Sequence, residues 1–138
     1  MRHSISDTSD LILDRRSIAP ERFSGRAVHR EIVEQVLQHA TWAPNHGLTQ
    51  PWRFHVFMDG ASKRLMSQLA VAYRAHAGSA AMDVKAEKIE NRGVRCNAVV
   101  ALGLAHNEEG RFPLWEDQAA VAAGVQNMFL MCTAHGIG

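Results

Sequence analysis

The sequence lacks several features that would assign a protein to a particular class. Its 138 residues include 15 basic and 14 acidic side chains, for a formal net charge of +1. This balance gives no electrostatic reason to expect a nucleic acid or a membrane surface as partner. The most apolar stretch, Ala119 to Ala134, is interrupted by Gln126 and Asn127 and is too short to span a bilayer. We therefore expect neither a nucleic-acid nor a membrane partner.

Cysteine is also scarce, and Cys96 and Cys132 are far apart in the sequence. They form no C-x-x-C pair, which leaves a thioredoxin-like or zinc site without support. Residues 1–10 are polar rather than signal-like, so we expect a reducing, cytoplasmic location. The histidines show no metal-binding spacing, and neither a nucleophile elbow nor a P-loop is present. No metal site is therefore expected.

The hydrophobic pattern predicts the order helix, helix, strand, helix, helix, strand, helix in a single domain, 1–138. Such an order indicates the α+β class, with a small sheet covered by helices. The second strand is a continuous apolar run in which polar and apolar residues do not alternate, and this predicts that it is covered on both faces. Gly78-Ser79 is expected to end the third helix. The expected helices are a short one through Leu11 to Arg16 (capped by Asp7, Ser9 or Asp10, after loose residues 1–8), then 30–42, 62–76, 80–92 and 114–135, and the expected strands are 52–58 and 98–105.

The last predicted helix, 114–135, is apolar on nearly every side from Ala119 onward. A helix that is apolar all round must be buried all round, and one small domain rarely surrounds such a helix. A partner chain is therefore expected to cover part of it. Glu116-Asp117 has no histidine at ligand spacing and indicates the acidic first turn of this helix. Trp115 is expected in the core, with a substrate entrance as the alternative.

Arg15-Arg16-Ser17 closes the first predicted helix. Arginine meets an anion with paired N–H donors in a fixed fork, and the serine adds a hydroxyl. This combination suits a phosphate followed by a polyol chain, as in flavin mononucleotide (FMN). The alternative is a pair of cations that interacts with the dipole at the helix C-terminus.

The segment Ala43 to Trp52 reads A-P-N-H-G-L-T-Q-P-W. Pro44 and Pro51 stiffen it, and Gly47 allows a close approach of backbone. A rigid loop of this kind suits a flat heterocycle, which needs a stiff wall beneath its rings and a few amides along one edge.

Polar and aromatic side chains of the same segment provide the edge contacts. Asn45 and Gln50 offer side-chain amides, and His46 can donate or accept a hydrogen bond. Trp42 and Trp52 could flank a flavin ring, although a buried tryptophan at the start of a strand is an equal alternative for Trp52.

The order and separation of these two motifs, with the helix between them, resemble the nitroreductase family, in particular its small FMN-dependent members. The resemblance implies a nitroreductase-like fold and a homodimer built on the long apolar helix, with the flavin site at the subunit interface. It implies that Arg15, Arg16 and Ser17 hold the tail of FMN. It also implies that Trp42 contacts FMN, as part of a loop that includes Pro44, and that His46 reaches FMN from the partner subunit.

The chain departs from the wider family at two positions of the loop. Many larger relatives carry an asparagine where this chain has Leu48 and a serine where it has Asn45. Because Leu48 cannot hydrogen-bond a flavin edge, that contact must come from backbone or from Gln50.

The run His135-Gly136-Ile137-Gly138 matches the start of a glycine-rich turn that lies near the cofactor in the family, so Gly136 is a candidate FMN contact. The alternative is that Gly136 caps the last helix in the left-handed conformation. The resemblance also leads us to expect that the chain lacks the family's C-terminal strand and tail.

The activity that the resemblance implies is an oxidoreductase reaction. NAD(P)H passes hydride to flavin N5 and leaves, and a small-molecule electron acceptor such as a nitroaromatic or quinone takes its place in a ping-pong sequence. No catalytic side chain is named, because the flavin carries the chemistry. The alternatives are a non-enzymatic flavin carrier or sensor, an interaction domain without cofactor, and a dehalogenase or ring-cleaving relative of the same fold.

Overall fold

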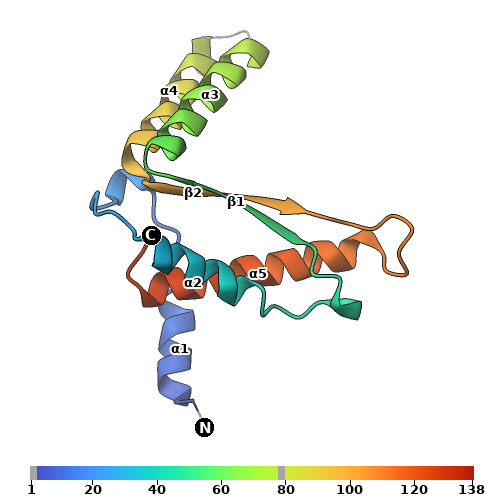
Figure 1. Ribbon diagram of the computed structural model, residues 1–138. Helices are drawn as coiled ribbons and strands as arrows, with labels where there is room; N and C mark the ends of the chain where they lie inside the picture. Colours follow the sequence, from blue (N-terminus) through green and yellow to red (C-terminus); the bar gives the residue numbers. More distant parts are fainter. Residues whose placement is uncertain (1–2, 78–79) are drawn as a thin grey trace. The chain divides into compact units, whose positions relative to one another are not determined.

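The computed structural model describes residues 3–77 and 80–138, and it confirms the expected order of helices and strands (Figure 1). The chain divides into two compact units, the first made of Met1–Ser17, His29–Phe54 and Leu102–Gly138, and the second of Ile18–Val28 and His55–Ala101. The predicted break at Gly78-Ser79 lies outside the described residues. The elements are α1 (Ile5–Asp14), η1 (Pro20–Arg22), α2 (Arg30–Ala40), η2 (His46–Leu48), β1 (Trp52–Met58), α3 (Gly60–Ala77), α4 (Ala80–Arg95), β2 (Ala98–Leu104) and α5 (Leu114–Ala134).

The first helix, α1, begins earlier than the sequence pattern predicted. Ser4 caps it, since the Ser4 hydroxyl accepts a hydrogen bond from the Asp7 amide at 3.4 Å. Serine is among the strongest N-cap residues, so the chain becomes helical six residues before Leu11. The expected caps Asp7, Ser9 and Asp10 were therefore wrong, as was the loose segment 1–8 within its described part.

In the first unit, α2 packs against α5. The buried residues of α2 are Val33, Val36 and Ala40, which are part of the predicted apolar face. Gly124 of α5 lets the helices approach closely, because a Cβ there would lie 3.1 Å from the Ala40 carbonyl oxygen. The helix stops at Ala40 rather than Trp42, and the Thr41 hydroxyl donates to the Gln38 carbonyl at 2.8 Å.

Trp52 belongs to the core of the first unit. It is buried together with Ala43 and Ala120, and Phe54 packs against this cluster. The core interpretation of Trp52 is thus correct, and the segment that follows α2 is anchored at both ends by buried side chains.

The two strands form an antiparallel ribbon, in which Ala105 N donates to Pro51 O at 2.7 Å and Asp59 N donates to Asn97 O at 2.7 Å. Each unit contains one end of this ribbon. Leu102 and Leu104 remain exposed, so the prediction that β2 is covered on both faces was wrong within this chain. The first three residues of β2 are half-buried, whereas Ala101, Leu102 and Leu104 are exposed.

The second unit is built on α3 and α4, which run side by side (Figure 1). Gly93 lies where they meet, and a Cβ at this position would be 2.9 Å from Met66 Cβ. Glu90 connects the helices at their surface through Arg74, at 3.5 Å. Among the described residues, no helix combines the length and the apolar character that crossing a membrane requires.

The last helix, α5, buries only one stripe of its surface within the chain, at Asp117, Ala120 and Gly124. A second stripe is exposed. Its members recur every three or four positions, as residues on one helix face do, and they are Trp115, Ala119, Ala122, Gln126 and Phe129. Trp115 is 64% exposed, so its expected place in the core was wrong.

Candidate cofactor site

The loop between α2 and β1 has an unusual backbone. Gly47, Leu48 and Gln50 have φ angles of 61°, 54° and 45°, all in the left-handed region. Side chains other than glycine enter this region at a cost in free energy, and such residues concentrate at functional sites. The segment that the sequence singled out as a rigid loop is therefore also a strained one.

Side chains of the loop itself hold part of this conformation. Asn45 Oδ1 accepts a hydrogen bond from the Gln50 amide at 3.0 Å, and Asn45 Nδ2 donates to the Ala43 carbonyl at 3.3 Å. Arg53 at the start of β1 donates to the Gln50 carbonyl at 3.0 Å. The amide of Asn45 is thus already engaged within the chain.

His46 connects the loop to the first turn of α5. Its Nδ1 lies 2.7 Å from Glu116 Oε2, and because an ionised carboxylate only accepts, Nδ1 carries the proton. The imidazole also lies against the ring of Phe112, with centroids 4.1 Å apart. Gly47 leaves room for that ring, since a Cβ at position 47 would lie 2.1 Å from Phe112 Cε2.

Asp117 forms a second connection and is only 3% exposed. Its Oδ1 accepts from the Thr49 hydroxyl and its Oδ2 from His106 Nδ1, each at 2.7 Å. The hydrogen bond from His106, and then that from Thr49, hold the pKa of Asp117 below its usual value and outweigh the opposite effect of burial. The sequence placed Glu116-Asp117 correctly in the first turn of a helix but gave no sign of their partners. His46 is 70 residues from Glu116 in the chain, and Thr49 is 68 residues from Asp117.

The lowered pKa of Asp117 predicts how an Asp117→Asn variant depends on pH. An unfolded aspartate titrates near about 3.9, so the carboxylate stabilises the fold above that pH and loses this contribution as pH falls through the lower folded value. The variant should be less stable than the natural chain at neutral pH, and the deficit should shrink below about pH 4. Urea unfolding at a series of pH values measures it, with the exposed Asp10→Asn as control. A deficit that is constant with pH would contradict the expectation.

The outer side of the loop is open to solvent. Trp42 is 80% exposed and Leu48 79% exposed, and Pro44 and Gln50 are exposed as well. Among the described residues, these four side chains make no hydrogen bond or ion pair with the rest of the chain. Of the candidate ring contacts, Trp42, Pro44 and Gln50 are therefore accessible, whereas Asn45 and His46 are engaged in hydrogen bonds with the chain.

The Arg15-Arg16-Ser17 motif follows α1 at once. Arg16 Nη1 donates to the carbonyls of Leu13 and Arg15, which satisfies the end of the helix as the dipole interpretation expects. The Arg15 guanidinium lies 6.0 Å from the centroid of Phe129 on α5. Across residues 3–77 and 80–138, neither arginine pairs with a carboxylate, and Ser17 is exposed.

Both motifs belong to the first unit, but they contact α5 at different places. Arg15 lies against Phe129, whereas Thr49 binds Asp117, twelve positions earlier. With a rise of 1.5 Å per residue, these two points of α5 are about 18 Å apart. One chain therefore does not bring the arginines and the loop into direct contact.

Gly136 completes a helix cap. It has a φ angle of 67°, its amide donates to Thr133 O at 3.0 Å, and the Ile137 amide donates to Cys132 O at 2.8 Å. This is the Schellman arrangement, in which a left-handed glycine satisfies the last carbonyls of a helix. The capping interpretation is correct, and a contact of Gly136 with a cofactor stays a prediction.

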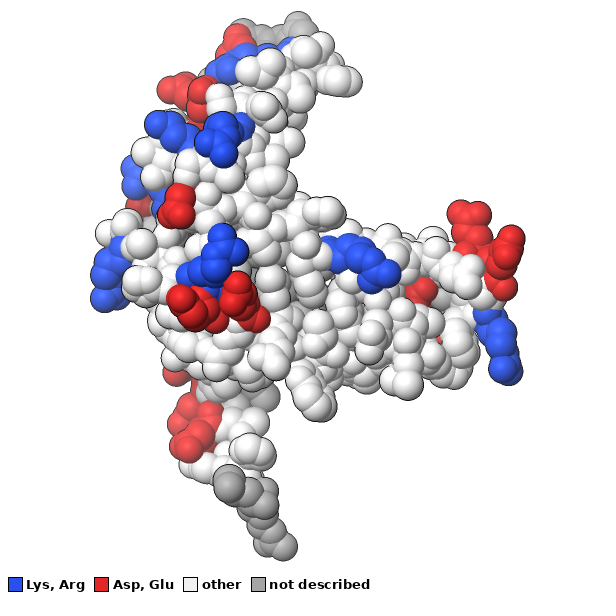
Figure 2. Space-filling view, viewed as in Figure 1, with Lys and Arg blue, Asp and Glu red and all other residues white. Residues whose placement is uncertain are grey.

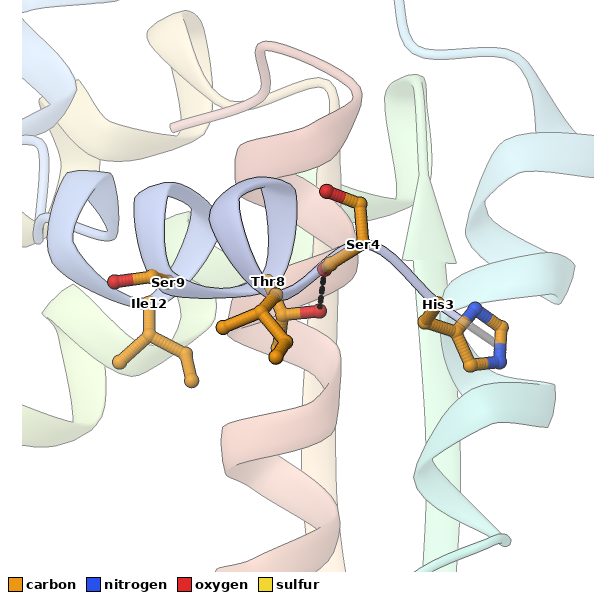
Figure 3. Close-up of a pocket in the computed structure, with 6 residues that line it drawn as sticks. His3, Ser4, Thr8, Ser9 and Ile12 are labelled. Atoms are coloured by element: carbon orange, nitrogen blue, oxygen red, sulfur yellow. Dashed lines mark hydrogen bonds between the residues drawn. The ribbon is translucent and has the colours of Figure 1, made fainter.

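An open depression of about 390 Å³ lies elsewhere, along α1 and its cap. Its lining residues are His3, Ser4 and four residues of α1 as far as Ile12, and Figure 3 shows the hydrogen bond from the Thr8 hydroxyl to the Ser4 carbonyl among them. None of the predicted site residues lines it. On the face drawn in Figure 2, basic and acidic side chains are interspersed, in keeping with the small net charge.

Comparison with known proteins identifies the family of this chain. The model of the nitroreductase family matches residues 12–138, which is most of the sequence and includes both motifs. The chain is a member of the nitroreductase family. The predicted family is thereby confirmed.

Individual relatives of this nitroreductase agree with that assignment. The YfhC protein of Bacillus subtilis, provisionally named an NAD(P)H nitroreductase, is 29% identical over 138 residues, covering 99% of this chain and 69% of that protein. Escherichia coli YdjA, with the same provisional name, is 28% identical over 133 residues, covering 96% of this chain and 69% of its own length. This nitroreductase thus spans about two thirds of the length of both relatives.

Solved structures confirm the nitroreductase-like fold. A nitroreductase-like protein from Bacillus cereus matches with a TM-score of 0.75 and 24% identity, over 99% of this chain and 69% of that one. The FMN-dependent nitroreductase NfnB of Mycobacterium smegmatis, in complex with NADPH, matches with a TM-score of 0.71 and 19% identity, over 95% of this nitroreductase and 72% of NfnB. The predicted α+β class with a small sheet is correct.

Proposed function

We propose that this nitroreductase binds FMN and is an NAD(P)H-dependent oxidoreductase that reduces nitroaromatic, quinone or similar acceptors by a ping-pong mechanism. Family membership and the names of the relatives support the class of reaction. The observation that carries the proposal for this chain is the pair Arg15 and Arg16, guanidinium groups without a carboxylate partner among the described residues.

The donor set at the end of α1 fits the anionic tail of FMN. A flavin phosphate is close to a dianion at neutral pH, and arginine offers it paired donors of fixed geometry. Arg16 uses Nη1 for the helix carbonyls and keeps other N–H groups for an anion. Ser17, which is exposed, is proposed to donate to a phosphate or ribityl oxygen.

The loop is proposed to form the wall for the isoalloxazine ring. Trp42 and Pro44 offer exposed apolar surface, and Gln50 offers an amide for the polar edge of the ring. Asn45 is proposed to shape the loop, because both ends of its amide bond to the chain, and its contact with the flavin stays a prediction. His46 is proposed to face the cofactor with the ring nitrogen that Glu116 leaves free.

A homodimer is part of the proposal. The two motifs lie about 18 Å apart along α5 in one chain, so a twofold pairing is proposed to bring the loop of one subunit to the arginines of the other. In such a pairing the same surface serves both subunits. The exposed stripe of α5, with Trp115 and Phe129 at its ends and Ala119, Ala122 and Gln126 between, supplies that surface.

When bound, FMN would accept a hydride from NAD(P)H and pass it to the acceptor. The chain contributes position and electrostatics. Arg15 and Arg16 fix the tail, and the strained loop, held by Glu116 and Asp117, fixes the plane against which the ring lies. An exposed Trp42 beside that plane is suited to contact a flat aromatic acceptor.

The absorbance spectrum of the purified protein is the first test. Bound flavin absorbs in the blue, and we then expect NADPH or NADH to be oxidised when menadione or nitrofurazone is added. A yellow protein without turnover would favour the flavin carrier or sensor, and a colourless protein that binds no added FMN would favour an interaction domain. Sedimentation at micromolar concentration should show a mass twice the 15.3 kDa of the chain, and a monomer would contradict the dimer.

A further inference from the structure

The loop between α2 and β1 has little backbone support. Among the described residues, no backbone–backbone hydrogen bond ties residues 44–50 to the rest of the chain, apart from any within its own helical turn. The backbone bonds stop at Ala43, which donates to Ala40 O, and resume at Pro51, which accepts from Ala105. The conformation of the loop therefore depends on side chains.

Thr49 lies between the two strained non-glycine residues of the loop. The residues on either side, Leu48 and Gln50, are both in the left-handed region, whereas Thr49 has a φ angle of −63°. Residues in sparsely populated conformations persist only where surrounding contacts fix them. The Thr49 hydroxyl provides such a contact, because it donates to Asp117 Oδ1 between the two strained positions.

Asp117 is not a helix cap. The residue before α5 is Pro113, which makes no side-chain cap bond, and Asp117 is the fourth residue of the helix. A buried carboxylate is costly unless hydrogen bonds compensate it. Here each carboxylate oxygen accepts one hydrogen bond. Oδ1 accepts from the hydroxyl of Thr49 in the loop, and Oδ2 accepts from the imidazole of His106 in the segment after β2. One buried group thus joins three separate segments of the first unit.

We propose that Asp117 is a positioning residue for the cofactor loop, and that the Thr49–Asp117–His106 chain of hydrogen bonds holds the loop in the strained form that receives the flavin ring. The inference rests on the proposed function for its consequence in flavin binding, but its structural part concerns the free protein. Neighbouring Glu116 holds His46 in parallel, so the loop is attached to the first turn of α5 at two points.

Thr49→Val tests the proposal, because it removes the hydroxyl and keeps the branched shape. Hydrogen exchange at the Gln50 amide, which donates to Asn45 Oδ1, reports opening of the loop. Loss of a hydrogen bond to a charged acceptor should speed this exchange roughly ten- to hundredfold. Thr49→Ser should restore the natural rate. Thr41→Val is the matched control, since it removes a threonine hydroxyl that bonds Gln38 O at the end of α2.

A positioning role predicts that the effect stays local. Amides in the centres of α2 and α5 should exchange as in the natural chain. FMN should bind roughly tenfold or more weakly to Thr49→Val, while the rate of NAD(P)H oxidation at saturating FMN changes less. An unchanged Gln50 amide in Thr49→Val, or equal acceleration throughout the chain, would overturn the proposal. If the natural chain bound no FMN, the proposed function would fail, and the exchange experiment would still decide the role of Asp117.

Discussion

Replacing Arg15 and Arg16 together by alanine is expected to weaken FMN binding by about 10² to 10⁴-fold. Hydrogen bonds to charged groups contribute roughly 1.5–3 kcal/mol each, and removing two such hydrogen bonds together corresponds to that range. The natural pair has no carboxylate partner in residues 3–77 and 80–138, so the substitutions break no ion pair there. Titration of the apoprotein with FMN, followed by flavin fluorescence, measures the change.

The controls separate charge from geometry. Arg15→Lys with Arg16→Lys keeps both charges but loses the planar fork, and should recover part of the affinity. Arg30→Ala removes an exposed arginine of α2 that pairs with Glu34 at 3.9 Å, and should leave FMN binding unchanged. Equal weakening by Arg30→Ala, or no weakening by the double alanine variant, would contradict a specific phosphate site at the end of α1.

The sequence predicted the elements of the fold well where local signals decide them. The apolar spacing of Val33, Val36 and Ala40 identified α2, and the turn residues Asp59-Gly60 limited β1 to the observed 52–58. The start of α1 was missed because Ser4 caps the helix in place of the later candidates Asp7, Ser9 and Asp10. Helix ends depend on such individual hydrogen bonds, which periodicity does not reveal.

The candidate site was predicted only in part, again because individual hydrogen bonds are not visible in the sequence. The two prolines and Gly47 of the loop are visible in the sequence, and they mark a segment whose backbone is in fact unusual, with positive φ angles at Gly47, Leu48 and Gln50. The partners of the loop are not visible, since His46 and Thr49 bind Glu116 and Asp117 across about half the chain. No local pattern connects residues so far apart. A buried acid next to a helix start is indistinguishable, in sequence, from one that only complements the helix dipole.

The burial of β2 and of Trp115 could not be predicted for a different reason. Apolar side chains indicate that a surface is to be covered, but they do not say by what. Leu102, Trp115 and Phe129 are exposed in the single chain, although their pattern is that of covered residues. The proposed dimer gives a consistent explanation for Trp115 and Phe129, because both belong to the exposed stripe of α5.

Gly47→Ala is expected to have the second large effect, on the loop rather than on the phosphate contacts. A side chain at a φ angle of 61° costs about 1–2 kcal/mol. The added Cβ would also lie 2.1 Å from Phe112 Cε2, so either the ring or the loop must move. Overpacking of this kind costs about 1–3 kcal/mol, and the free energy of unfolding should fall by roughly 2–5 kcal/mol in all.

A double-mutant cycle with Phe112→Ala separates the two causes. Removing the ring makes space for the new methyl group but leaves the backbone strain, so Gly47→Ala should cost only about 1–2 kcal/mol in the Phe112→Ala background. Gly47→Ala should likewise weaken flavin binding more in the natural chain than in the Phe112→Ala background, because a displaced loop no longer presents its wall to the ring. If the two substitutions were additive, Phe112 would not pack on Gly47, and the close contact that orients His46 beside the loop would have to be abandoned.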